Sequence, residues 1–142
     1  MGIRALIVAA LWVTLPAGAA DIAKVGDLEL HCVATPTTEL TGEAAKAYNV
    51  TPSPGRGLLT VTLMRKSRNG EAKTVPGQIY AGAINQNNLL SSIPIREVYE
   101  GDNVYYLGEY RVGAPDTLRF LVNATSMGKI LKAEFSRAFP AP

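Results

Sequence analysis

The chain has 142 residues, of which 47% are hydrophobic and 18% are charged. It has 14 basic and 12 acidic side chains. One of the basic residues, Arg4, lies in the N-terminal leader, so 13 basic and 12 acidic side chains remain without it. This balance gives no reason to expect nucleic acid or an acidic membrane surface as a partner. The single cysteine excludes an internal disulfide, and one histidine with one cysteine is too few for a zinc site of nitrogen and sulfur ligands.

The first twenty residues have the three parts of a secretory signal peptide. One positive charge, on Arg4, precedes an apolar run from Ala5 to Leu15, and small residues follow Pro16. The run is shorter than the roughly 20 apolar residues that a bilayer-spanning helix needs. We therefore expect residues 1–20 to be a signal peptide, cleaved after Ala19 or Ala20, and the mature protein to act outside the cytoplasm.

The mature chain, residues 21–142, is long enough for one domain without a disulfide, because about 120 residues can bury roughly two-thirds of their unfolded surface. No cysteine stands at the cleavage point, so we expect no lipid anchor. Short segments in which apolar and polar residues alternate predict antiparallel strands separated by turns. They cover residues 28–32, 59–64, 79–84, 93–99, 104–112, 118–124 and 131–135.

Turn residues between these segments support the same interpretation. Asn69-Gly70 is a strong hairpin signal, and a second turn is expected at Glu100-Gly101-Asp102-Asn103. Pro94 predicts an edge position for the strand at 93–99. About seven strands with turns every 8–12 residues predict an all-β fold, a small antiparallel β-sandwich of immunoglobulin-like type.

One short segment is helical in character. Thr41 is a suitable N-cap for a helix over residues 42–48, and Asn49 suits a left-handed exit from it. The prolines of residues 51–55 cannot continue a helix, so this stretch is expected to be a loop.

His31 and Cys32 are adjacent on a predicted strand and must point to opposite faces. They cannot form a thiol–imidazole pair. We expect Cys32 to be buried and unreactive in the core and His31 to be exposed or at an edge, the alternative being a lone acid–base or pH-sensing group. The sequence predicts no metal site.

The strand at 104–112 is apolar on both faces. Tyr106 and Tyr110 share one face, which leaves Tyr105, Leu107 and Arg111 on the other. Either another segment covers this second face, such as the helix or the 50–57 loop, or it is an exposed patch for a partner, peptide or sugar. If a functional surface exists, we predict it around these residues and the Arg56 loop, because tyrosine and arginine dominate binding hot spots.

Other chemistry has weaker signals. Gly55-Arg56-Gly57 precedes a strand and so favours a loop over a phosphate-binding turn, with Arg56 as a candidate anion-binding residue, and no cofactor is predicted. The acidic residues of the 97–109 hairpin are explained by a turn, although paired carboxylates for glycoside hydrolysis or calcium ligands are alternatives. They are Glu97, Glu100, Asp102 and Glu109.

Taken in order, several of these motifs resemble a bacterial family of unknown function, domain-of-unknown-function family 4426, over essentially the whole mature chain. The family comprises small exported proteins of Gram-negative bacteria. The resemblance implies a periplasmic β-rich domain and transfers no activity, cofactor or catalytic residue. It is carried by residues 26–31, Leu40, Ala44, Ala47-Tyr48, residues 56–60, 96–98, 101–107 and 118–120, and Phe135.

These observations favour a non-enzymatic binding or interaction module whose partner is a protein, peptide or glycan of the envelope. Two other functions stay open. One is a hydrolase of an envelope polymer that uses the carboxylates near the 97–109 hairpin. The other is a chaperone-like domain that adds a client strand to an exposed sheet edge.

Export is directly testable. We expect protein recovered from the periplasm of the producing bacterium to have the intact mass of a chain that begins at Ala20 or Asp21, because the signal peptide is removed. A recovered mass that includes Met1 to Ala19 would contradict this.

Overall fold

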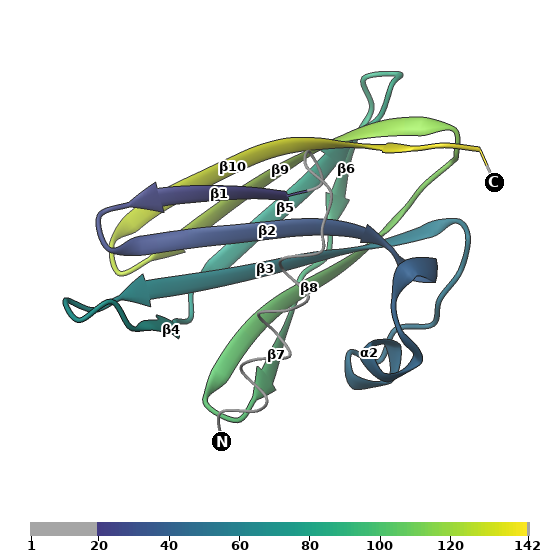
Figure 1. The fold of residues 1–142 in the computed structure, drawn as a ribbon. Coiled ribbons are helices and arrows are strands. Elements are labelled where there is room, and N and C mark those ends of the chain that lie inside the picture. Colours follow the sequence, from purple (N-terminus) through teal and green to yellow (C-terminus); the bar gives the residue numbers. More distant parts are fainter. Residues whose placement is uncertain (1–19, 142) are drawn as a thin grey trace.

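The computed structural model describes residues 20–141, and the predicted signal peptide lies outside that range apart from Ala20. Two antiparallel sheets pack face to face, and one short α-helix lies beside one end of the larger sheet (Figure 1). The predicted antiparallel β-sandwich with one short helix is confirmed.

The larger sheet has six strands in the order β1-β2-β3-β8-β7, and β4 pairs with the far end of β3. The long strands β2 and β3 run antiparallel through its middle, and β1 and β7 form its two edges. The bounds are Ala20–Val25 for β1, Leu28–Pro36 for β2, Arg56–Lys66 for β3, Ala72–Thr74 for β4, Arg96–Glu100 for β7 and Asn103–Arg111 for β8.

The smaller sheet has four strands in the order β10-β9-β5-β6. On one side of the sandwich β10 lies next to β1, where the Glu134 amide donates to a carboxylate oxygen of Asp21 at 3.2 Å (Figure 1). On the other side the edges of the two sheets are β6 and β7. The bounds are Gln78–Ile84 for β5, Leu90–Ile93 for β6, Asp116–Ser126 for β9 and Lys129–Phe139 for β10.

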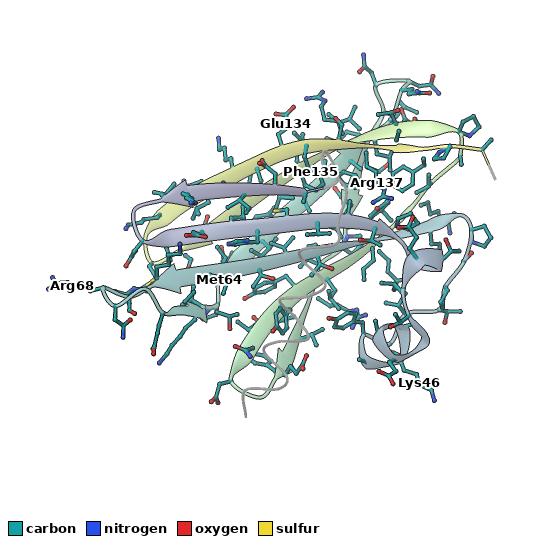
Figure 2. All side chains as sticks on the ribbon, viewed as in Figure 1. Lys46, Met64, Arg68, Glu134, Phe135 and Arg137 are labelled. Carbon is teal, nitrogen blue, oxygen red and sulfur yellow. The ribbon has the colours of Figure 1, made fainter. Side chains whose placement is uncertain are left out.

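The main core fills the space between the sheets. Alternate residues of the long strands enter it, so that Phe135 of β10 points inward while Glu134 points outward (Figure 2). Phe120 stacks on Phe135 and meets the edge of Tyr110, with ring centroids 5.1 and 4.9 Å apart. These aromatic contacts contribute about 0.5–1.5 kcal/mol each beyond the burial of apolar surface.

A second, smaller core lies on the outer face of the larger sheet. Leu58 of β3 and Leu107 of β8 are 1% and 0% exposed there and pack with Val50. The α-helix α2 (Gly42–Ala47) and the loop after it supply the cover, because Tyr48 and Val50 come from this segment. The helix and loop therefore cover apolar side chains on the outer face of the larger sheet, which would otherwise be exposed to solvent.

Local signals explain the helix. The Thr41 hydroxyl accepts a hydrogen bond from the Ala44 amide at 3.1 Å, which is the predicted N-cap. Asn49 adopts a φ of 55°, the predicted left-handed exit. A 3-10 turn, η1 (Thr37–Glu39), links β2 to this helix.

The structure has ten strands where the sequence predicts about seven. The segment at 93–99 is divided: Ile93 ends β6 in one sheet, and Arg96 begins β7 in the other. The expectation of one strand there was wrong, because Pro94 cannot donate to a strand ladder and the chain crosses between sheets at this point. The sequence reading also missed β1 and the short β4, which completes the hairpin at Asn69-Gly70.

Cys32 is fully buried in the main core, and burial raises the pKa of its thiol, so the reactive thiolate is disfavoured as predicted. His31 lies on the opposite face, but it is half-buried on an interior strand rather than exposed or at an edge. Its Nε2 makes a 2.9 Å hydrogen bond with Glu29. Burial alone would raise the pKa of Glu29, but hydrogen bonds from Lys66 and His31 lower it below its ordinary value.

The small core makes a direct prediction. Replacing Leu107 with alanine should lower the free energy of unfolding by ~3 kcal/mol, because it removes a fully buried side chain and leaves a cavity. Leu89→Ala is the control, since Leu89 is 62% exposed and should change stability by less than about 0.5 kcal/mol. Equal denaturation midpoints for the two variants would contradict the packing described here.

Candidate functional site

The four residues predicted for a functional surface divide into two groups. Tyr105 and Leu107 are 8% and 0% exposed, and Leu107 is covered by the small core, so they do not form an exposed binding patch. Arg56 and Arg111 instead line a pocket at the end of β8. Of the two alternatives for the second face of β8, Leu107 is therefore covered by another segment of the chain. The two arginines remain as candidate site residues.

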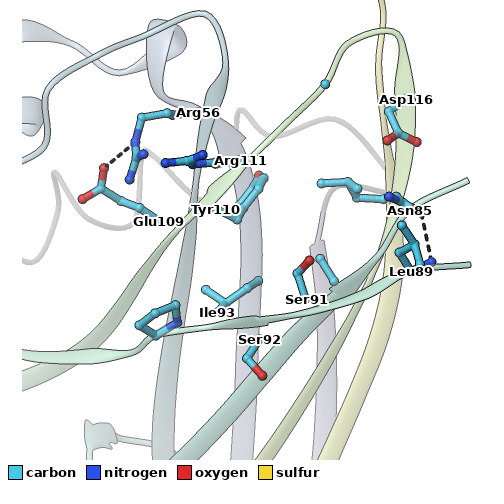
Figure 3. A pocket seen from close by; sticks show the side chains of 14 residues that line it. Arg56, Asn85, Leu89, Ser91, Ser92, Ile93, Glu109, Tyr110, Arg111 and Asp116 are labelled. Carbon is cyan, nitrogen blue, oxygen red and sulfur yellow. Dashed lines mark hydrogen bonds and ion pairs between the residues drawn. The ribbon is translucent and has the colours of Figure 1, made fainter. Parts of the chain in front are cut away.

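This pocket, called the corner pocket below, has a volume of about 540 Å³ and lies where the two sheets separate (Figure 3). It is open because β7 pairs with β8 only as far as Leu107, so Gly108–Arg111 have no partner on that side within the described chain. Apolar side chains from both sheets form the floor, and polar side chains form the rim. The floor includes Ala83, Ile93, Tyr110 and Leu118, and the rim includes Arg56, Asn85, Ser91, Glu109, Arg111 and Asp116.

Two guanidinium groups dominate one wall. Arg56 of β3 and Arg111 of β8 are directly opposite each other in the antiparallel register. The Arg56 Nε donates to Glu109 at 3.4 Å, a long and partly exposed contact. Within residues 20–141 no carboxylate lies within ion-pair distance of Arg111. Like charges directly opposite each other on a sheet destabilise it, so this pair of arginines weakens the end of the β3–β8 ladder in the free protein.

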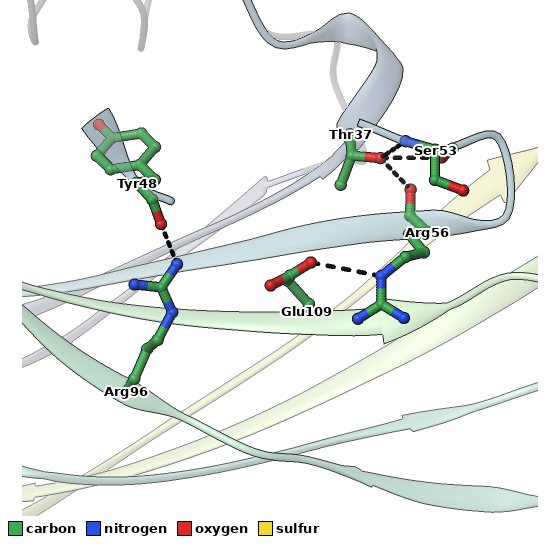
Figure 4. Close-up of polar contacts among 6 residues, drawn as sticks. All are labelled: Thr37, Tyr48, Ser53, Arg56, Arg96 and Glu109. Atoms are coloured by element: carbon green, nitrogen blue, oxygen red, sulfur yellow. Dashed lines mark hydrogen bonds and ion pairs between the residues drawn. The ribbon is translucent and has the colours of Figure 1, made fainter. Parts of the chain in front are cut away.

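The backbone at Arg56 is fixed by one buried hydroxyl (Figure 4). Thr37 is fully buried, and its Oγ1 accepts a hydrogen bond from the Ser53 amide at 2.9 Å. The single proton of the same hydroxyl is shared between the carbonyl oxygens of Ser53 and Arg56, which lie 2.9 and 3.0 Å from Oγ1. The loop before β3 is thereby held against η1, and the start of β3 has a defined position at the pocket.

The opposite wall is polar and is also ordered by hydrogen bonds. The Asn85 side-chain oxygen accepts from the amides of Asn87 and Leu89, at 2.9 and 3.0 Å, which shapes the turn between β5 and β6. A carboxylate oxygen of Asp116 accepts from the Gln86 amide at 3.1 Å. Figure 3 shows Asn85 and Asp116 across the pocket from Arg56 and Glu109, so the two walls differ in charge.

Tyr110 forms part of the floor and joins it to the main core. Its ring lies directly over Gly57, and a Cβ at that position would collide with the ring, which is the reason that glycine stands there. Burial raises the pKa of the Tyr110 hydroxyl. Within the described part of the chain this buried hydroxyl has no hydrogen-bond partner, which costs free energy in the folded state.

The acidic residues of the 97–109 hairpin do not form one site. Glu100 and Asn103 face each other across a tight turn, as predicted, with Gly101 at a φ of 62°. Glu109 lines the corner pocket, whereas Glu97 lines a different pocket and accepts a hydrogen bond from Tyr106. Across residues 20–141 no three His, Cys, Asp or Glu side chains are grouped so that they could hold a metal ion.

Sequence reasoning missed most of the corner pocket. Asn85 and Ser91 line it from the β5–β6 hairpin, and Asp116 lines it from the start of β9, all far in sequence from Arg56. Asp116 stands in a stretch interpreted only as a chain break, and Tyr110 was assigned only to the core. No local pattern marks these residues, because their proximity depends on how the strands cross at the open corner.

The fold and the pocket define the class: an antiparallel β-sandwich with a polar pocket at its open corner. The family model of a domain of unknown function, DUF4426, matches residues 22–140, and the chain therefore belongs to the DUF4426 family. The crystal structure of a DUF4426 family protein from Pseudomonas aeruginosa PAO1 has a TM-score of 0.70 to this chain, with 21% sequence identity. The match covers 89% of this chain and 100% of that one.

At that level of identity the likeness establishes the fold alone. None of the curated proteins matches the sequence significantly. The helices of the described region are too short and too polar to cross a membrane.

Tyr110 supplies a test of the pocket floor. Tyr110→Phe should leave the free energy of unfolding unchanged or raise it by about 1 kcal/mol, because it removes a buried hydroxyl that lacks a partner. Tyr110→Ala should lower it by about 3–5 kcal/mol, because the ring contacts Phe120 and Phe139 are lost. Chemical denaturation measures both, and a Phe variant as unstable as the Ala variant would show that the hydroxyl has a structural partner.

Proposed function

We propose that the mature domain is a non-enzymatic binding module of the periplasm and that its corner pocket holds an anionic group of a ligand. The group is a carboxylate or a phosphate, carried by a peptide or a glycan of the envelope. The composition of residues 1–20, typical of a signal peptide, supports the location.

One observation carries the proposal. Arg56 and Arg111 face each other in register at the pocket rim, and Glu109 contacts only Arg56, at 3.4 Å. A planar guanidinium presents donors in a fork that matches carboxylate and phosphate oxygens. An anion between the two side chains would remove their repulsion, so the free protein is arranged for such a ligand. The apolar floor and the polar wall of Asn85 and Asp116 would contact the remainder of the ligand.

The position of the carboxylates favours binding over hydrolysis. A glycoside hydrolase places two carboxyl groups on either side of one scissile bond. Here Glu109 is paired with Arg56, while Glu97 lines a separate pocket. The remaining corner-pocket carboxylate, Asp116, accepts backbone hydrogen bonds from Gln86 and Thr117.

The edge at β7 also argues against strand addition. This edge strand is five residues long, follows Pro94, and carries the charged residues Arg96, Glu97 and Glu100. Short length, charge and a nearby proline are features that protect edge strands from pairing with other chains. The pocket is therefore the better candidate for the functional surface.

The proposal is tested with defined anions. Inorganic phosphate and glucuronate are titrated into the mature domain, and backbone amide shifts are followed by NMR. Shifts are expected at Arg56, Arg111 and Ser91, and Arg111→Gln should weaken binding at least about tenfold, because it removes a charge-assisted fork. The same variant should be as stable as the native protein or more stable by about 0.2–1 kcal/mol, since it removes a like-charge pair.

Arg68→Gln is the matched control. It removes the same charge, but Arg68 lies at the tip of the β3–β4 hairpin, at the opposite end of β3 from Arg56 (Figure 2). Its affinity for both anions should equal that of the native protein. Equal losses in the two variants, or no shifts at the corner pocket with either anion, would overturn the proposal.

A further inference from the structure

A second pocket lies on the open side of the sandwich and shares no residue with the corner pocket. It has a volume of about 250 Å³ and is called the tyrosine pocket below. It lies between the start of β5, beyond the stretch paired with β6, and the edge strand β7. Its lining residues are Gln78, Ile79, Tyr80, Ile95, Glu97 and Tyr106.

The carboxylate of Glu97 is held in place from inside the protein. The buried Tyr106 hydroxyl donates to Glu97 Oε2 at 2.9 Å. That hydroxyl in turn accepts a hydrogen bond from the Gly77 amide, also at 2.9 Å. Because the Tyr106 hydroxyl proton is directed at Oε2, that oxygen has a defined position, and the carboxylate can accept further hydrogen bonds at its remaining lone pairs.

This carboxylate has no cationic neighbour. Within the part of the chain that the structure describes, no lysine, arginine or histidine lies within ion-pair distance of Glu97. The adjacent Arg96 faces the other side of the strand, where its guanidinium donates to the Tyr48 carbonyl oxygen (Figure 4). Glu97 is exposed, so its negative charge makes no ion pair with the described residues and is open to a cation from solution.

Two exposed aromatic rings accompany the charge. Tyr80 lines the pocket and is 68% exposed, and Tyr99, two residues beyond Glu97, is 65% exposed. Tyr99 lies within hydrogen-bond reach of Glu97, whose carboxylate raises the pKa of the Tyr99 hydroxyl. Tyrosine is enriched at binding surfaces, because its ring is apolar while its hydroxyl is polar.

We propose that the tyrosine pocket binds an organic cation, an ammonium or guanidinium group, with Glu97 as the counter-ion and the faces of Tyr80 and Tyr99 as cation–π contacts. Aromatic rings around an anionic group are the usual means of recognising such cations. A calcium ion would need six or more oxygen ligands. The side chains of this pocket offer only one carboxylate, one amide and two phenolic oxygens. The cation is either the head of a small molecule or a lysine or arginine side chain of a partner.

The test uses choline and the amide of N-acetyl-lysine as probes of the two sources. The control is 3,3-dimethyl-1-butanol, called dimethylbutanol below, which has the shape of choline with a carbon in place of the charged nitrogen. It measures how much of the affinity comes from apolar contacts alone. Titration of the mature domain, followed by amide NMR shifts, should place both cations at Tyr80, Glu97 and Gly77. Dimethylbutanol should bind at least about tenfold more weakly than choline, because it lacks the charge that Glu97 and the rings attract. The probe with the higher affinity identifies the source.

Two variants and a matched control complete the experiment. Glu97→Gln keeps an acceptor for Tyr106 but removes the charge, and should weaken choline binding about tenfold. Tyr80→Ala changes an exposed side chain, so the fold should be retained while affinity falls several-fold. Glu100→Gln removes the same charge from the same strand on its opposite face and should bind as the native protein does.

The proposal would be overturned by equal binding of choline and dimethylbutanol, by equal losses in the Glu97 and Glu100 variants, or by an absence of shifts at the tyrosine pocket with both cations. If Glu97→Gln does not fold, as thermal melting would show, unchanged choline affinity in Tyr80→Ala would overturn it instead.

Discussion

The antiparallel pairing of β3 with β8 is the constraint on which both cores and the corner pocket depend. Its register places Leu58 and Leu107 on the outer face, where they form the small core, and Val61 and Tyr106 on the inner face. At the end of the same ladder it places Arg56 opposite Arg111. A one-residue slip would exchange the faces, expose the apolar set and separate the arginines. Both the folded core and the wall of the two arginines therefore depend on one register.

The two pockets arise because the sandwich closes on one side only. The edge strands β1 and β10 lie side by side, whereas β6 and β7 belong to different sheets and are joined by the short crossing at Pro94. The close approach of that crossing to β8 requires Gly108, since a Cβ there would meet Ile93 and Ile95. Each pocket occupies one part of this open side, and their charged groups differ: two arginines and two carboxylates line the corner pocket, whereas one carboxylate, Glu97, lines the tyrosine pocket.

Hydroxyl groups position the charged residues of both sites from within the fold. Thr37 fixes the backbone of Arg56, and Tyr106 fixes the carboxylate of Glu97. Each of these buried hydroxyls both accepts a hydrogen bond and donates one. These bonds restrain the hydroxyl and, through it, the group to which it donates. The charged groups are thus preorganised while their outer surfaces stay open to solvent.

Features that depend on neighbouring residues along the chain were predictable from the sequence. Alternation gave most strands and their buried faces, including Cys32 opposite His31, and the Thr41 cap and Asn49 exit gave the helix. Alternation also showed that the strand at 104–112 is apolar on both sides, but it left open what covers Leu107. Three features follow from packing between distant segments. The helix and loop cover Leu107, the chain at Pro94 crosses between two sheets, and Asn85 and Asp116 line the same pocket as Arg56 and Arg111. The physical reason is that local periodicity fixes which way a side chain points, whereas the packing of distant strands fixes what it meets.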